Sequence, residues 1–138
     1  MRNMLIDANI LLEVLLEQNK AVECKDILKK IKEGTKSATI STFTIDSIIL
    51  IMERNEMGVN ELSIFLNSLL NYKGLEIYQT TIEDRLNALD LIQEFQLDYE
   101  DSITLQSALS NEIEEILSFD KHFDSVKSIK RIEPSENL

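Results

Sequence analysis

Short apolar runs alternate with longer stretches of helical periodicity along the whole chain, and this alternation most restricts how it can fold. In the longer stretches, apolar residues recur every three or four positions, which is typical of helices that cover a core. The short runs are typical of brief buried strands. The predicted strands are 5–6, 38–41, 75–78, 116–119 and 128–132. The predicted helices are 9–16, 21–33, 42–56, 60–70, 82–95 and 100–111, with a turn or short helix at 121–124.

Strands that alternate with helices favour an α/β domain with a mostly parallel sheet and right-handed crossovers. The chain has 138 residues, a length typical of one compact domain. It contains no internal repeat and no linker, so we expect a single domain over 1–138 with a polar tail at 134–138. Three glycines and one proline are too few for a turn-rich all-β chain.

The cysteine and histidine contents exclude several kinds of site. The single cysteine, Cys24, rules out a disulfide framework and a multi-cysteine zinc site, and we expect it to be a reduced core residue. The single histidine, His122, rules out a histidine-rich metal centre, and we expect it to be a surface residue rather than a general base.

Nothing in the sequence predicts attachment to a membrane. The longest apolar runs, such as 45–52, are interrupted by polar residues and are too short to span a bilayer. The amino terminus reaches a carboxylate at Asp7, too soon for a secretory apolar segment. We therefore expect a cytoplasmic protein.

Acidic residues follow the predicted strands or begin the next helix. Asp7 ends the first strand, Asp46 lies early in the helix after the second, and Asp120 ends the fourth. Asp101 begins the helix that leads to the fourth strand. Ligands bind beyond the carboxyl ends of parallel strands, where Asp7, Asp46 and Asp120 should meet and Asp101 can join them.

Clustered carboxylates repel one another unless a cation lies among them. Oxygen ligands without histidine or thiolate suit Mg²⁺ or Mn²⁺. Such ions can bind a phosphodiester, activate water and stabilise the leaving oxygen, so the pattern is typical of metal-assisted phosphodiester hydrolysis. The chain has 25 acidic residues, however, and any one of these could instead be a helix cap or a solvated charge.

Several segments resemble the motifs of the PIN-domain ribonucleases, the fold of the VapC toxins. The sequence LIDANILL at 5–12 resembles the opening strand of that family with its Asp and Asn. The sequence ISTFTIDS at 40–47 resembles the segment that usually carries Glu in an apolar helix. The sequence YEDSITLQSA at 99–108 resembles the third motif, an Asp followed by a helix with Ala seven residues on. The sequence ILSFDKHF at 116–123 resembles the last motif, and 129–134 resembles the closing strand.

The resemblance covers essentially the whole chain, with its motifs in family order. It implies a three-layer α/β/α sandwich, Mg²⁺ or Mn²⁺ as cofactor and endoribonuclease activity on RNA. It also implies a homodimer and, if the chain is the toxin of a toxin–antitoxin pair, a small antitoxin partner. The implied metal ligands are Asp7, Asp46, Asp101 and Asp120, and the implied residues that orient them are Asn9 and Ser118.

The sequence departs from the family pattern at two positions. Asp46 stands where Glu is usual, so its carboxylate reaches about one carbon–carbon bond less far. Ser118 stands where Thr is usual and keeps the hydroxyl group. Asp98 and Glu100 lie beside Asp101, so the register of the third motif is open between them.

The net charge of −11 argues against binding a polyanion. With four acids assigned to metal, 21 acids still face 14 bases, so we expect weak and salt-dependent affinity for RNA. The lysines of helix 21–33 are either a solvated face or a strip that guides RNA or docks a partner.

Two other functions stay open. One is a catalytically inactive PIN-like interaction module. The other is a receiver-like signalling domain, which also has an acidic Mg²⁺ pocket. A receiver needs an acidic pair after the first strand, whereas Asp7 has Ile6 and Ala8 as neighbours.

Overall fold

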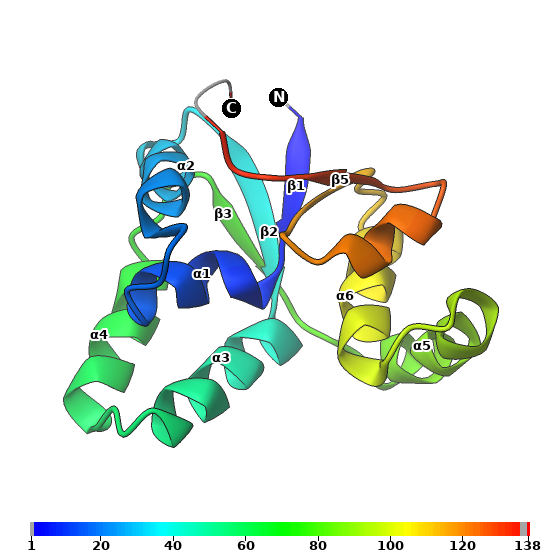
Figure 1. Cartoon of the computed structure of the whole chain (residues 1–138), viewed down its shortest axis with the longest axis horizontal. Helices are drawn as coiled ribbons and strands as arrows, with labels where there is room; N and C mark the ends of the chain where they lie inside the picture. Colours follow the sequence, from blue (N-terminus) through cyan, green and yellow to red (C-terminus); the bar gives the residue numbers. More distant parts are fainter. Residues whose placement is uncertain (1, 136–137) are drawn as a thin grey trace.

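The computed structural model describes residues 2–135 and 138, which form a parallel sheet flanked by helices (Figure 1). The strands are β1 (Asn3–Ile6), β2 (Ser37–Ser41), β3 (Leu75–Tyr78), β4 (Glu115–Leu117) and β5 (Lys130–Ile132). The helices are α1 (Ala8–Leu15), α2 (Ala21–Glu33), α3 (Thr42–Arg54), α4 (Val59–Leu69), α5 (Ile82–Phe95) and α6 (Tyr99–Ser110). A 3₁₀ helix, η1 (Lys121–Ser125), lies between β4 and β5.

The sheet has the strand order β3-β2-β1-β4-β5, and every neighbouring pair is parallel. Leu5 of the central strand pairs with Thr39 on one side and with Ile116 on the other. The chain moves outward from β1 to β3, then returns to β4 on the opposite side of β1. The topological switch point therefore lies between β1 and β4, where open α/β sheets bind their ligands.

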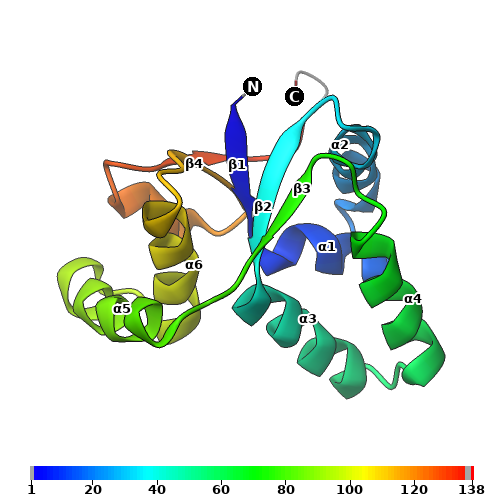
Figure 2. The same cartoon turned by 180° about the vertical axis from the view of Figure 1, so that it is seen from behind.

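Helices cover both faces of the sheet, which confirms the predicted three-layer α/β/α architecture. Helices α1 to α4 lie on one side, and α5 and α6 lie on the other (Figure 2). Side chains of β1 alternate accordingly: Met4 and Ile6 belong to the core beneath α1 to α4, and Leu5 belongs to the core beneath α6. None of the described helices is long and apolar enough to cross a bilayer.

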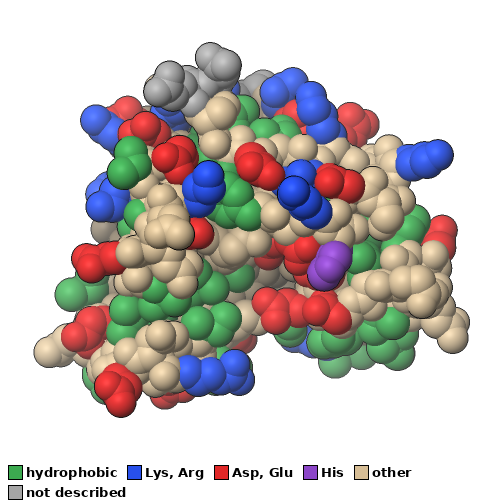
Figure 3. Space-filling view, viewed as in Figure 1, with side chains coloured by type: hydrophobic (Ala, Val, Ile, Leu, Met, Phe, Trp, Pro, Cys, Tyr) green, Lys and Arg blue, Asp and Glu red, His purple; other side chains and the backbone are tan. Residues whose placement is uncertain are grey.

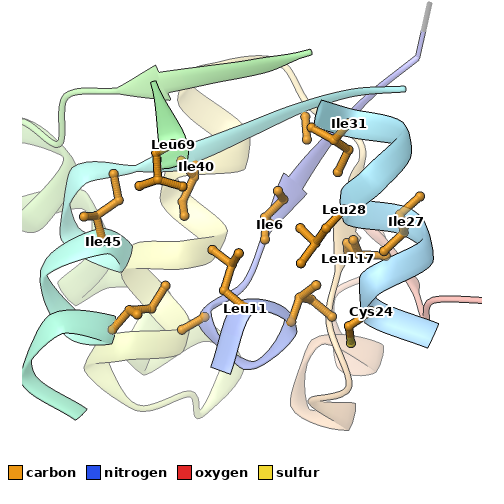
Figure 4. Close-up of a cluster of buried hydrophobic side chains, with 14 of the residues drawn as sticks. Ile6, Leu11, Cys24, Ile27, Leu28, Ile31, Ile40, Ile45, Leu69 and Leu117 are labelled. Atoms are coloured by element: carbon orange, nitrogen blue, oxygen red, sulfur yellow. The ribbon is translucent and has the colours of Figure 1, made fainter. Parts of the chain in front are cut away.

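The larger core joins the sheet to the first four helices (Figure 4). It includes Ile6 and Ile40 from the sheet, Leu11 from α1 and Leu69 from α4. Cys24 lies in this core and is fully buried, as the sequence predicted. Burial raises the pKa of the Cys24 thiol to about 12, so the thiol stays protonated and unreactive at neutral pH.

Some helices and strands begin or end at other residues than the sequence predicted, because of local backbone conformation or hydrogen bonds. Gly34 ends α2 in the left-handed conformation, as its position predicted. Helix α3 stops at Arg54 rather than at 56, because Glu56 has a φ of 63°, which a helix cannot accommodate. The strand expected at 128–132 begins only at Lys130, because the amide of Ile129 bonds back to the carbonyl of Val126 in a turn.

The strand expected at 116–119 is instead Glu115–Leu117. It ends there because the Ser118 hydroxyl accepts a hydrogen bond from the amide of Asp120, two residues on, which turns the chain out of the sheet. The polar tail expected at 134–138 includes residues 136 and 137, which lie outside the described part of the chain.

Candidate active site

Asp7 lies where β1 ends and α1 begins, next to the switch point of the sheet. Only 7% of the surface of this residue is exposed to solvent. As the cap of α1 it accepts a hydrogen bond from the amide of Ala8, with 2.8 Å between that nitrogen and Oδ1. Burial is the main cause that raises the pKa of Asp7 to about 6, and the charges of Asp120 and Glu100 raise it further.

Ser118 connects the ends of β1 and β4. Its hydroxyl donates to Asp7 Oδ2 at 2.6 Å and accepts from the amide of Asp120 at 2.9 Å. The side-chain amide of Asn9 donates to Asp7 Oδ2 and to Ser118 Oγ, both at 3.2 Å. These contacts fix the direction of the Asp7 carboxylate, the arrangement expected of groups that orient a ligand.

Asp101 lies in the first turn of α6 and is buried. Asp98 caps this helix by accepting a hydrogen bond from the amide of Asp101, and both Asp98 and Glu100 are exposed. Of the three neighbouring acids, Asp101 is the buried one and contacts His122, while Glu100 lies near enough for its charge to raise the pKa of Asp7. Burial is the main cause that raises the pKa of Asp101 to about 7, and the charges of Asp120 and Asp98 act in the same direction.

His122 lies between two of the acids, although the sequence suggested only a surface residue. Its ring is indeed exposed, at 71% of the side-chain surface. Its Nδ1 atom nevertheless lies 3.1 Å from Asp101 Oδ2 and 3.1 Å from Asp120 Oδ1. These contacts, and above all the hydrogen bond with Asp101, raise the pKa of His122. Only its position two residues after Asp120 could have drawn attention to it.

The sequence also gave no indication of a role for Arg131 of β5. Its guanidinium group bonds to the carbonyl oxygen of Ser118 at 3.2 Å, to Asp124 of η1 at 2.8 Å and to Glu133. It therefore joins β4, η1 and β5 around the loop that carries Asp120. A basic residue that closes such a loop leaves no sequence motif, because its partners are set by tertiary contacts.

Asp46 differs from Asp7 and Asp101 in being exposed to solvent. It is the fifth residue of α3, and its side chain is exposed. Among the described residues, no hydrogen bond or ion pair joins its carboxylate to Asp7, Asp101 or Asp120.

One face of α3 is directed at the beginning of α6. Phe43 packs edge-on against Tyr99, with ring centroids 5.9 Å apart, and the charge of Arg54 lowers the pKa of Glu100. Residues at spacings of four and three share a helix face, so Ser47 lies on the face of Phe43 and Arg54. Asp46, three residues after Phe43, also borders this face, and its side chain is exposed to solvent.

The remaining groups suit a hard or intermediate divalent cation. One donor atom each from Asp101, Asp120 and His122 lie within 4.8 Å of one another, and the bonded junction at Ser118 brings Asp7 beside Asp120. Two buried carboxyls with raised pKa values are the electrostatic situation that a bound cation relieves. The surface around the histidine side chain, purple in Figure 3, is rich in acidic side chains.

Comparisons with known proteins agree with this fold. The sequence model described as "PIN domain" matches residues 4–129. No curated protein matches the chain. Three solved structures with similar folds are a toxin–antitoxin complex from Klebsiella pneumoniae, the sarcin–ricin loop cleaving toxin VapC20 of Mycobacterium tuberculosis, and VapBC2 from Rickettsia felis bound to a promoter DNA fragment.

The likeness to these structures extends over nearly full chains but not to the details of sequence. The Klebsiella chain is 19% identical, with a TM-score of 0.70, over 96% of this chain and 98% of that one. VapC20 is 13% identical, with a TM-score of 0.71, over 88% and 93%. The Rickettsia chain is 13% identical, with a TM-score of 0.70, over 96% and 99%. Because the family model spans most of the sequence, this chain belongs to the PIN domain family.

Proposed function

We propose that this protein is a Mg²⁺- or Mn²⁺-dependent endoribonuclease that hydrolyses RNA phosphodiester bonds in the cytoplasm. The observation that carries the proposal is the pair of buried carboxyls, Asp7 and Asp101, grouped with Asp120 at the carboxyl edge of the sheet. Family membership and the likeness to a toxin that cleaves the sarcin–ricin loop support RNA as the substrate.

In this proposal, each residue of the site has a separate task. Asp7, Asp101 and Asp120 hold the divalent cation, and Ser118 and Asn9 keep the Asp7 carboxylate turned toward it. When bound, the cation supplies positive charge that polarises the phosphodiester and makes water a stronger nucleophile. Asp46 stays a predicted fourth ligand, although its exposed carboxylate makes no hydrogen bond or ion pair with the other three.

The test is cleavage of a pool of structured RNA hairpins by purified protein with Mn²⁺ or Mg²⁺, with a chelator as the metal-free control. We expect cleavage by the native protein and a loss of about 10²-fold or more in Asp7→Asn and Asp101→Asn. Asp90→Asn is the matched control, because Asp90 is an exposed acid on α5, away from the site.

Full activity in Asp101→Asn would refute the proposal, provided that circular dichroism shows all three variants folded. If the native protein neither binds a divalent cation nor cuts RNA, the inactive interaction module predicted as the alternative becomes the better description. The net charge of −11 is the observation that favours this alternative.

A homodimer is part of the proposed function, as the family resemblance implied. Helix α5 exposes Ile82, Leu86 and Leu89 at spacings of four and three, so one face of the helix is apolar and open to solvent. A second copy packed on this face would bury these side chains. Light scattering should give the mass of a dimer for the native chain and of a monomer for Leu86→Lys, and an unchanged dimer in this variant would place the interface elsewhere.

A small antitoxin protein is the proposed inhibitor, because several structures with this fold are toxin–antitoxin complexes. A surface hollow of about 260 Å³ between α1 and α2 offers a place for it, with Val14, Leu28 and Tyr72 among the lining residues and Lys25 and Lys29 beside them. This lining suits an apolar side chain flanked by acidic ones. Co-expression with the product of a neighbouring short gene should yield a complex, and Lys29→Glu should weaken it.

A further inference from the structure

The spacing of three donor atoms at the site resembles that of ligands around one ion. The Nδ1 atom of His122 lies 3.1 Å from Asp101 Oδ2 and 3.1 Å from Asp120 Oδ1. Neighbouring ligands of an ion with bonds of about 2.1 Å lie roughly 3.0 to 3.4 Å apart in octahedral or tetrahedral geometry. The imidazole nitrogen is thus already at a suitable distance from both carboxylates.

The position of the His122 ring is not explained by core packing. The side chain is 71% exposed. Its backbone amide bonds to Asp120 Oδ1 at 2.9 Å, and its carbonyl oxygen accepts from the Ser125 hydroxyl at 3.1 Å, so the backbone is fixed at the start of η1. The ring itself reaches across to Asp101, 21 residues earlier in the chain. The ring is therefore directed at the two carboxylates.

We propose that His122 is a nitrogen ligand of the same divalent cation as Asp101 and Asp120, so the site favours transition-metal ions over Mg²⁺. The physical reason is ligand preference: Mg²⁺ favours oxygen donors, whereas ions such as Zn²⁺ and Co²⁺ also bind imidazole well. This inference rests on the proposed metal site, and it adds a ligand and a metal preference to it.

The first test compares Zn²⁺ and Mg²⁺ affinities by calorimetry in protein without a histidine tag. In His122→Ala, we expect Zn²⁺ affinity to fall at least about tenfold and Mg²⁺ affinity to change little, since a direct ligand should matter at least as much as the groups around it. His122→Asn restores an oxygen donor but not the imidazole, so it should lose Zn²⁺ affinity and keep Mg²⁺ affinity. Lys121→Ala is the control: it removes a neighbouring exposed charge and should leave the ratio of the two affinities unchanged.

The second test uses the fact that His122 is the only histidine in the chain. Nitrogen NMR of histidine-labelled protein then gives one imidazole, and Zn²⁺ should shift its Nδ1 signal while the proton stays on Nε2. In Asp101→Asn, the same addition should leave the signal in place.

The outcomes separate the two proposals. In one outcome, the native protein binds Zn²⁺ through Asp101, but the imidazole signal does not shift and His122→Ala leaves the ratio of Zn²⁺ to Mg²⁺ affinity unchanged. That outcome refutes the ligand role of His122 and leaves the metal site in place. If the native protein binds neither Zn²⁺ nor Mg²⁺, the proposed metal-dependent function fails together with this inference.

Discussion

The Ser118 hydroxyl donates a 2.6 Å hydrogen bond to Oδ2 of Asp7, a residue 111 positions away in the sequence. The same hydroxyl accepts from the amide of Asp120, so one oxygen connects the ends of β1 and β4. This junction lies at the switch point of the sheet, and it turns two acids from separate strands into neighbours.

Removal of the Ser118 hydroxyl should loosen the Asp7 carboxylate. In Ser118→Ala, we expect metal affinity and RNA cleavage to fall roughly 10- to 100-fold, the range typical of groups that orient metal ligands. Ser118→Thr keeps the hydroxyl and should retain most activity. Calorimetry with Mn²⁺ and cleavage rates measure both effects, and equal losses in the two variants would mean that packing rather than the hydrogen bond matters.

Asp46 and Asp101 should differ in importance for catalysis, because of the two only Asp101 interacts with His122 and Asp120. We expect the loss of cleavage rate in Asp46→Asn to be about tenfold smaller than the loss in Asp101→Asn. Parallel assays at saturating metal measure the difference. Equal losses would show that the Asp46 carboxylate moves into the site when metal or RNA binds.

Arg131 should position the loop that carries Asp120 and His122. Its planar group reaches Ser118, Asp124 and Glu133 at once, a geometry that lysine cannot reproduce. We therefore expect Arg131→Ala and Arg131→Lys both to lower the turnover number, by roughly tenfold, with little change in KM. Far-ultraviolet circular dichroism should show a native fold in both. A fully active Arg131→Lys would reduce the role of Arg131 to that of a simple charge.

Asp84 should stabilise the fold far from the site, in a pH-dependent way. Although burial opposes ionisation, hydrogen bonds from Ser110, Thr81 and Tyr78 together lower the pKa of Asp84 below its usual value. Its folded-state pKa is thus below its unfolded-state pKa, so its stabilising effect is present above about pH 4 and disappears as the pH falls further.

Replacement of Asp84 should therefore destabilise the protein most at neutral pH. Asp84→Ala removes hydrogen bonds to a charged group, including the bond from the Thr81 amide that completes the capping box of α5, and we expect this to cost about 2–3 kcal/mol at pH 7. Urea unfolding at pH 7 and pH 3 measures the effect, and the difference between native and variant should shrink at pH 3. An equal difference at both values would mean that the Asp84 charge is unimportant.

Gly74 should tolerate no side chain. A Cβ atom there would lie 2.1 Å from the Lys36 carbonyl oxygen and 2.8 Å from that of Ile31, both backbone atoms that cannot easily move. Gly74→Ala should therefore lower the free energy of unfolding by about 1–3 kcal/mol. Gly58→Ala is the control, since its Cβ would meet only the flexible Glu61 carboxylate at 3.3 Å. Thermal unfolding should separate the two variants clearly.

The sequence by itself determined the order and type of most elements. Alternating apolar runs and helical periodicity predicted the α/β class, Gly34 marked the end of α2, and Thr81 marked the start of α5. It also placed Asp7 at the junction of β1 and α1, because this carboxylate directly follows an apolar strand and precedes an apolar helix. These features are local, so they can be read from neighbouring residues.

Only the tertiary structure decided how the acidic residues are grouped. How α3 packs against α6 depends on contacts between distant helices, so the sequence could not show that the Asp46 carboxylate is exposed and makes no hydrogen bond or ion pair with the other three acids. The approach of His122 to Asp101 depends in turn on where η1 sits beside α6, and Arg131 helps to hold η1 there. Such contacts join residues far apart in the chain, and the physical reason that sequence patterns miss them is that periodicity records only local geometry.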